Sequence, residues 1–153
     1  MNFRTSEDLL AMMRGFQAPA VLGAAAELGL LAALARAPLS AGAAADALGA
    51  DPRGTTVLLD ALAALGVVRK EAGIYALPPE LQPWLSAESP SNVLPMLCHQ
   101  ANCLRRWARL AWTVREGAPS EAGPSVRGPA GDLESFIQAM NVVARVVRHR
   151  TPG

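Results

Sequence analysis

The sequence predicts a mainly α-helical fold in a single domain over residues 1–153. At its centre we expect a winged helix-turn-helix with a small β-hairpin wing, because the stretch 39–77 carries signals for two short helices and then a hairpin. Further helices are predicted over residues 6–35 and 93–150, where apolar residues recur at helical spacing. Hydrophobic residues make up 51% of the chain and aromatic residues only 5%, with many alanines, which favours closely packed helices over a large sheet.

Two N-cap signals start the short helices of the predicted winged helix. Ser40 is a favourable N-cap, and Gly49 ends the helix that follows. Asp51 caps the second helix, and Pro52 occupies its first position, where a missing N–H costs nothing. The core faces of these helices are expected to carry the apolar residues at helical spacing, which are Ala44, Ala47, Leu48, Val57, Leu58, Leu62 and Leu65.

A hairpin is predicted directly after Gly66, which ends the second helix. Its first strand begins at Val67, a tight turn lies at Ala72 and Gly73, and the second strand runs over residues 74–77 before two prolines end the pairing. This hairpin would form the wing.

A winged helix binds either DNA or protein, and the charges favour protein. A helix that reads the major groove needs basic or amide side chains, but the second helix offers only Arg53 and also carries Asp60. In the hairpin, Arg69 and Lys70 are followed by Glu71, which is typical of a solvated strand end. A net charge of +1 favours no polyanion. We expect no nucleic-acid partner and keep a DNA-binding transcriptional regulator as the alternative.

Two helices are predicted before the winged helix. The first covers residues 6–17 and has Glu7 and Asp8 in its first turn, where the helix dipole favours acids. The second lies within residues 18–35, which contain a single charge, Glu27.

The stretch 18–35 is apolar on every side and is therefore expected to be buried on every side. Because a domain of this size has little volume to surround such a helix, we expect it in a subunit interface, where Gly23, Ala24 and Ala25 would let a partner helix approach closely. The alternative is an ordinary core helix. Its alanines, glycines and Pro19 make membrane insertion weak, so no membrane partner is expected.

After the hairpin, a proline-rich connector leads to a long helix predicted over residues 93–116, which Gly117 ends. Trp84 and Leu85 are expected to anchor the connector in the core. The arginines of the long helix are expected on a solvated face, and these are Arg105, Arg106, Arg109 and Arg115.

A loop rich in Gly, Pro and Ser is predicted over residues 117–131. Asp132 is expected to cap the last helix. The apolar face of this helix carries Leu133, Phe136, Ile137, Met140, Val143, Ala144 and Val147.

The compartment is predicted to be cytoplasmic. Glu7 and Asp8 stand where a signal peptide would need positive charge and then an apolar run. Cys98 and Cys103 are five residues apart, which on a helix separates them by about 140° and prevents a mutual disulfide. Reduced thiols are therefore expected.

Four segments occur in the order found in one enzyme family. They are APAVLGAAAELGLLAALA at 18–35, LGADPRGTTVLLDALAALGVV at 48–68, WARLAWTVREG at 107–117 and FIQAMN at 136–141. With them, nearly the whole chain resembles the N-terminal dimerisation region of S-adenosylmethionine-dependent O-methyltransferases of the caffeate, hydroxyneurosporene and polyketide type.

The resemblance implies an intertwined homodimer whose N-terminal regions form one wall of the acceptor pocket. By position, the wall residues would be Cys98, His99, Phe136 and Met140. Met12 or Met13 would enter the partner's pocket. A plainer interpretation stands beside this one, because Phe136 and Met140 lie on an apolar stripe that any core requires, and His99 would be a partly exposed polar residue.

In this family a Rossmann-like domain follows the last helix, binds S-adenosylmethionine and carries a catalytic base. The chain ends at Gly153 without a strand followed by a Gly-x-Gly loop, and His99 and His149 lack supporting carboxylates. We therefore assign no catalytic, cofactor-binding or metal-binding residues and expect the chain alone to be inactive. The full-length enzyme would use S-adenosylmethionine and a hydroxylated small-molecule acceptor. A stand-alone dimeric ligand-binding module is a further alternative.

Overall fold

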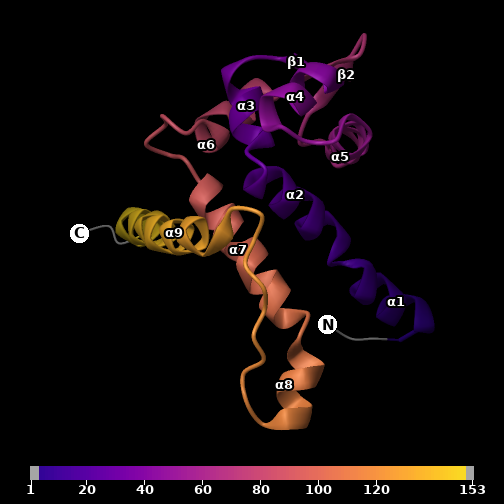
Figure 1. Ribbon diagram of the computed structural model, residues 1–153, viewed down its shortest axis with the longest axis vertical. Coiled ribbons are helices and arrows are strands. Elements are labelled where there is room, and N and C mark those ends of the chain that lie inside the picture. The colour runs from indigo at the N-terminus through magenta and orange to yellow at the C-terminus, as the bar shows by residue number, and fades with distance from the viewer. Residues whose placement is uncertain (1–3, 151–153) are drawn as a thin grey trace.

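The computed structural model describes the backbone of residues 4–150 and the side chains of residues 4–145. This part of the chain is mainly helical, as predicted, and holds one small antiparallel sheet (Figure 1). Its elements are α1 (Ser6–Arg14), α2 (Gln17–Glu27), α3 (Leu30–Arg36), β1 (Leu39–Ser40), α4 (Ala41–Leu48), α5 (Pro52–Ala64), β2 (Arg69–Glu71), β3 (Ile74–Ala76), the 3₁₀ helix η1 (Pro79–Leu81), α6 (Gln82–Leu85), α7 (Leu94–Trp107), α8 (Leu110–Glu116) and α9 (Gly128–Arg150).

The two N-caps predicted in the stretch 39–77 both form. The Ser40 side chain accepts a hydrogen bond from the backbone N–H of Ala43, 3.2 Å from its Oγ, and starts α4. Asp51 accepts the backbone N–H of Gly54 at 2.6 Å and starts α5. Gly49 ends α4 in the left-handed conformation. The helices α4 and α5 are followed by the hairpin β2–β3, which is the element order predicted for the winged helix.

The hairpin turn falls at the two predicted residues, Ala72 with φ +48° and Gly73 with φ +79°. Two successive positive φ angles are the mark of a type I′ turn, whose twist matches that of a hairpin. The sheet also contains a third strand, which the sequence did not predict: β1 pairs with β3, placing Leu39 opposite Tyr75, and the strand order is β1-β3-β2.

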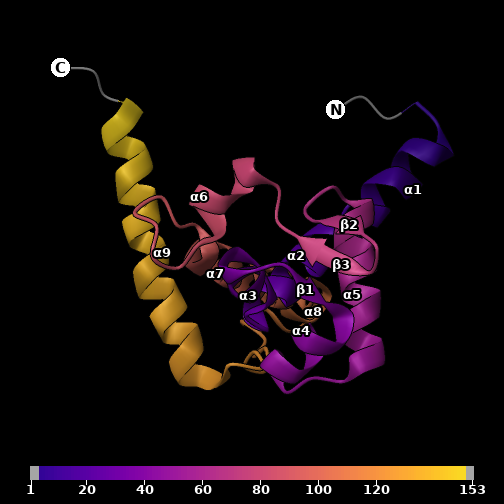
Figure 2. The same ribbon diagram turned by 90° about the horizontal axis from the view of Figure 1, so that it is seen from above.

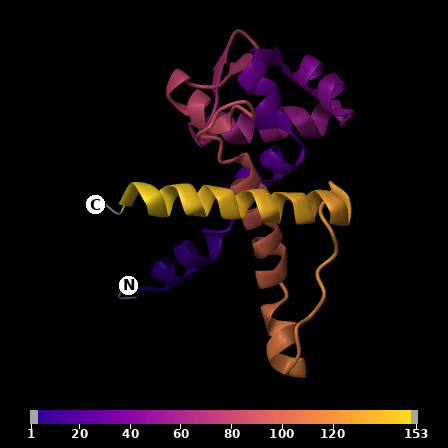
Figure 3. The same cartoon turned by 90° about the vertical axis from the view of Figure 1, so that its left-hand side faces the viewer.

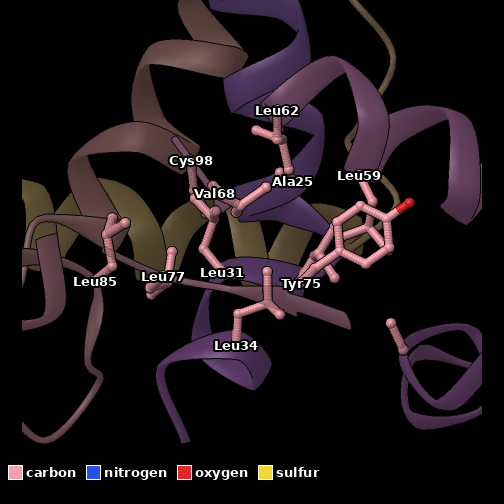
Figure 4. Close-up of a cluster of buried hydrophobic side chains, with 13 residues drawn as sticks. Ala25, Leu31, Leu34, Leu59, Leu62, Val68, Tyr75, Leu77, Leu85 and Cys98 are labelled. Carbon is pink, nitrogen blue, oxygen red and sulfur yellow. The ribbon is translucent and has the colours of Figure 1, made fainter. Parts of the chain in front are cut away.

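The hydrophobic core lies between α3, α5 and the sheet (Figure 4). Large side chains from these elements are almost fully buried, namely Leu30, Leu31, Leu34, Leu59, Leu62 and Tyr75. Several residues predicted to be in the core are instead exposed. In α5, Leu59 and not Val57 is turned inward. The exposed ones are Ala47, Val57, Leu65 and, in the connector, Trp84.

The apolar stretch 18–35 is not one helix buried on all sides. It divides into α2 and α3 at Gly29, whose φ of +78° breaks the helix. The start of α2 is exposed, and the leucines of α3 are buried in the core of the same chain. The close approach expected for a partner helix is made within the chain, because a Cβ added to Gly23 would lie 2.9 Å from the Cβ of Ala101 on α7.

The helical stretch Ser6–Glu27 is long and apolar enough to cross a membrane by length and composition alone. Of its most apolar 18-residue window, 17% is buried inside the described structure. One such stretch near an N-terminus is weak evidence, because core helices of soluble proteins pass the same test.

Two predicted boundaries near the C-terminus were wrong. The helix predicted over residues 93–116 is broken into α7 and α8, with Ala108 and Arg109 between them. The helix α9 begins at Gly128, four residues before Asp132, so Asp132 lies inside the helix and does not cap it.

The residues of α9 that are buried are not those of its predicted apolar face. Ser135, Ala139 and Val142 are buried. The larger side chains on its other faces are 41% to 60% exposed, and these are Leu133, Phe136, Ile137, Met140 and Val143. Val147 and His149 lie outside the residues whose side chains are described.

The elements α3 to α6 form a compact group at one end of the molecule, and long helices project from this group. Figure 3 shows α3 to α6 grouped together, with α7 leading away from them and α9 crossing α7. Figures 1 and 2 show α1 and α9 on opposite sides of the molecule. Arg145 fixes α9 to the connector by donating to the carbonyl oxygens of Pro90 and Asn92.

Candidate functional site

A cavity of about 540 Å³ lies beside α7, where α9 and the preceding segment 118–127 cover it. This volume falls within the range of small-molecule sites. Five residues of α7 line it, together with residues from the first turns of α9. From α7 these are His99, Asn102, Cys103, Arg105 and Arg106, and from α9 they include Asp132, Leu133 and Phe136.

Two rings form an aromatic corner of this cavity. The ring centroids of His99 and Phe136 are 5.3 Å apart and the ring planes are inclined by 56°. The Sγ of Cys103 lies 3.7 Å from Nε2 of His99, one turn away on the same helix. A flat aromatic molecule could lie against one ring face and meet the edge of the other.

Arg105 connects three elements at the back of the cavity. Its Nη1 donates to Oε1 of Glu27 on α2 at 2.6 Å, and its Nη2 donates to the side-chain oxygen of Asn102 and lies 4.0 Å from Oδ1 of Asp132 on α9. Only 30% of the Arg105 side chain and 11% of the Glu27 side chain are exposed. The prediction that Arg105 belongs to a solvated face was therefore wrong.

Asp132 is held in its ionised form. Burial opposes ionisation, but hydrogen bonds from the backbone N–H and side chain of Ser125 and from Asn102, together with the charge of Arg105, lower the pKa of Asp132. These contacts also fix the segment 118–127 against α9.

The hairpin and α5 form a second polar cluster, on the surface that a DNA-binding winged helix would use. Lys70 Nζ lies 2.6 Å from Oδ1 of Asp60, and the hydroxyl of Tyr75 donates to the same oxygen at 2.6 Å. Arg69 pairs with Glu80 at 3.3 Å. Both cations of the hairpin therefore have an acidic partner within the chain.

A family model described as the O-methyltransferase dimerisation domain matches residues 10–79. The chain contains an O-methyltransferase dimerisation domain.

Relatives extend the likeness beyond this region. Acetylserotonin O-methyltransferase of Mus musculus is 37% identical over 124 residues, covering 74% of this chain and 32% of the mouse protein. The tetracenomycin polyketide synthesis 8-O-methyl transferase of Streptomyces glaucescens is 32% identical over 160 residues, covering 99% of this chain and 47% of that protein. The chain thus spans less than half of the length of each of these two relatives.

The chain is also similar to a solved structure of a methyltransferase. The human N-acetylserotonin methyltransferase, solved in complex with SAM, is 28% identical and superposes with a TM-score of 0.69 over 93% of this chain and 46% of the human chain. The resemblance drawn from the four sequence segments is therefore confirmed.

The described residues 4–150 do not form a Rossmann-type site for SAM. A site for a nucleotide-like cofactor in a Rossmann-type fold needs parallel strands followed by a glycine-rich loop. Within residues 4–150 the strands are two to three residues long, and they pair only antiparallel. The same residues hold no group of three or more His, Cys, Asp or Glu side chains placed for a metal ion.

The residues predicted for the acceptor wall divide into three groups. His99 and Phe136 meet at the cavity. Cys98 does not line it, since this thiol lies in the core at 6% exposure, where burial raises its pKa, partly offset by Arg127 and Ser135.

The three predicted methionines lie away from the cavity lining. Met140 follows Phe136 by one turn of α9 and is 41% exposed. Met12 and Met13 are exposed on α1.

Sequence reasoning missed most of the polar lining of the cavity between α7 and α9. Asn102, Cys103 and Arg106 follow His99 by three, four and seven residues, so helical spacing could have placed them on one face with it. Nothing comparable signalled Asp132, because its contacts with Ser125 and Arg105 depend on how α9 packs against α7.

Proposed function

We propose that this chain is the dimerisation region of a small-molecule O-methyltransferase and forms one wall of its acceptor pocket. The observation that carries the proposal is the cavity between α7 and α9, where the rings of His99 and Phe136 form an aromatic corner. The full-length enzyme would transfer a methyl group from S-adenosylmethionine to a hydroxyl of the acceptor. This chain would contribute shape and orientation to that reaction, while the catalytic base and the cofactor site would lie elsewhere.

The homodimer part of the proposal is supported by large apolar side chains that a single chain leaves exposed. Soluble monomers rarely expose such contiguous apolar patches. One patch lies on α9 and carries Leu133, Phe136, Ile137, Met140 and Val143. The other lies on α1 and the turn after it and carries Leu9, Leu10, Met12, Met13 and Phe16.

Met12 and Met13 would act on the partner subunit. They are 61% and 69% exposed and do not line the cavity of their own chain. On the projecting helix α1, a flexible methionine could fill irregular space in a pocket of the second subunit. Met140 follows Phe136 by one turn of α9 and would lie at the edge of the pocket in its own subunit.

The two alternative functions have less support. A DNA-binding regulator needs free cations on the hairpin, and the pairs Lys70–Asp60 and Arg69–Glu80 occupy them. A stand-alone dimeric ligand-binding module would use the same cavity and the same patches, so it differs from our proposal only in lacking a catalytic domain in the full-length protein.

Binding of 2-naphthol tests the acceptor-wall role. We expect saturation-transfer NMR to detect 2-naphthol on the 153-residue chain and Phe136→Ala to weaken this binding several-fold, because the variant removes one ring of the corner. The matched control is Trp84→Ala, which removes an exposed aromatic side chain on α6. Equal binding by both variants would contradict the proposal. Calorimetry with S-adenosylmethionine should give no binding heat.

A further inference from the structure

The cavity wall carries more positive than negative charge. Arg105 and Asp132 line it as a compensated pair, with Glu27 as a second acid on Arg105 and Ser125 as a donor to Asp132. These four residues therefore satisfy one another. Arg106 lines the same cavity and adds a further cation.

Arg106 has no acidic partner among the ion pairs of the described residues 4–145. It is exposed, so its guanidinium keeps its five donors available to a ligand or to water. A planar guanidinium matches a carboxylate in a bidentate pair, which gives both attraction and a fixed orientation.

The distance between Arg106 and the ring corner sets the size of a ligand that could reach both. His99 and Arg106 are seven residues apart on α7, which corresponds to about 10 Å along a helix. An arginine side chain can cover several ångströms of this span. A fused two-ring or three-ring aromatic molecule with an acidic substituent at one end would fill the remainder.

Resting on the proposed function, we infer that the acceptor pocket selects aromatic acceptors that carry an anionic group. The rings of His99 and Phe136 contact the aromatic body, and the guanidinium of Arg106 binds the anion. Arg105 does not bind the anion, because Glu27, Asn102 and Asp132 already take up its donors. Arg106 is thus a residue that determines which acceptors bind.

The test compares two probes of the same shape, 2-naphthoate and the neutral 2-naphthamide, titrated into the complete chain and followed by chemical-shift changes of His99 and Phe136. We expect the acid to bind about fivefold more tightly than the amide at low salt, because a partly solvated ion pair contributes modestly. Arg106→Gln should lower the affinity for the acid to about that for the amide and so remove this preference. Arg53→Gln, which removes an exposed arginine from α5, should keep it.

The other outcomes separate the two proposals. Equal affinities of the wild-type chain for the acid and the amide would overturn the selectivity for anions, while leaving the acceptor-wall role in place. A preference for the acid that survives Arg106→Gln would overturn the role of Arg106. If neither probe nor 2-naphthol shifts the signals of His99 and Phe136, the acceptor-wall role itself is wrong.

Discussion

Gly23 determines how closely α2 and α7 approach. A Cβ at this position would lie 2.9 Å from the Cβ of Ala101, a methyl group that cannot move away without its helix. We expect Gly23→Ala to lower the free energy of unfolding by about 1–2 kcal/mol, because the two helices must separate. Urea denaturation followed by circular dichroism measures this change.

The control for Gly23 is another helical glycine. Gly42 lies in α4, and a Cβ there would meet no atom within 4 Å. Gly42→Ala should raise the free energy of unfolding by about 0.5–1 kcal/mol through helix propensity. If Gly23→Ala stabilises the chain as much as Gly42→Ala does, the close packing of α2 on α7 is wrong.

Asp60 links α5 to the hairpin in a pH-dependent way. The hydrogen bonds from Lys70 and Tyr75 lower the pKa of Asp60. The stabilisation is therefore complete above the ordinary aspartate pKa of about 3.9 and is lost as the pH falls through the lowered pKa of the folded state. Asp60→Asn should unfold at lower urea than the wild type at pH 6, and the difference should shrink towards pH 2.5.

Asp46 provides the matched control for this pH series. It is exposed on α4 and forms no ion pair among the described residues. Asp46→Asn should unfold close to the wild type throughout. The difference in the urea concentration of unfolding between Asp60→Asn and wild type could also stay constant from pH 6 to pH 2.5. The ionised carboxylate would then not be what stabilises the hairpin.

At the level of elements, the features that the sequence predicted correctly are those that neighbouring residues determine. The caps at Ser40 and Asp51 and the turn at Ala72 and Gly73 each depend on a few adjacent residues. The strand β1 was missed because its two residues pair with β3, which lies more than thirty residues later in the chain. Periodicity identified α9 as amphipathic but could not say which face would meet α7.

In the candidate site too, the features that depend on residues far apart in the chain could not be predicted from local patterns. His99 and Phe136 were identified by resemblance to a family, and the structure brings their rings together. Periodicity alone would have assigned Phe136 to a core, and it is 46% exposed. The polar network around Arg105 could not be predicted, since Glu27 and Arg105 are separated by 78 positions in the chain.

Arg105 holds the three helical elements α2, α7 and α9 together. Arg105→Met should lower the free energy of unfolding by about 1–3 kcal/mol, because it leaves the mostly buried Glu27 without its partner. Hydrogen exchange in the first turns of α9 should also become faster, since Asp132 loses a charge partner.

Two further variants decide whether the ion pair causes this effect. Arg115→Met removes a 64% exposed arginine of α8 and should change stability by less than about 0.5 kcal/mol. The double variant Glu27→Gln/Arg105→Met should be more stable than Arg105→Met alone, because position 27 no longer carries a mostly buried, unpaired carboxylate. If both Arg105→Met and Arg115→Met lower the free energy of unfolding by the same amount, the ion pairs of Arg105 do not stabilise the chain.

At the scale of the whole molecule, the exposed apolar face of α9 predicts a homodimer. Light scattering at micromolar concentration should give twice the 16.0 kDa mass of the chain. Ile137 is 57% exposed on α9, so Ile137→Glu would place a charge in the interface without disturbing the core of one chain. This variant should become monomeric and keep its helical circular dichroism spectrum. Val57→Glu, at a 63% exposed position of α5, should remain dimeric. A dimer that survives Ile137→Glu but not Val57→Glu would move the interface from α9 to α5.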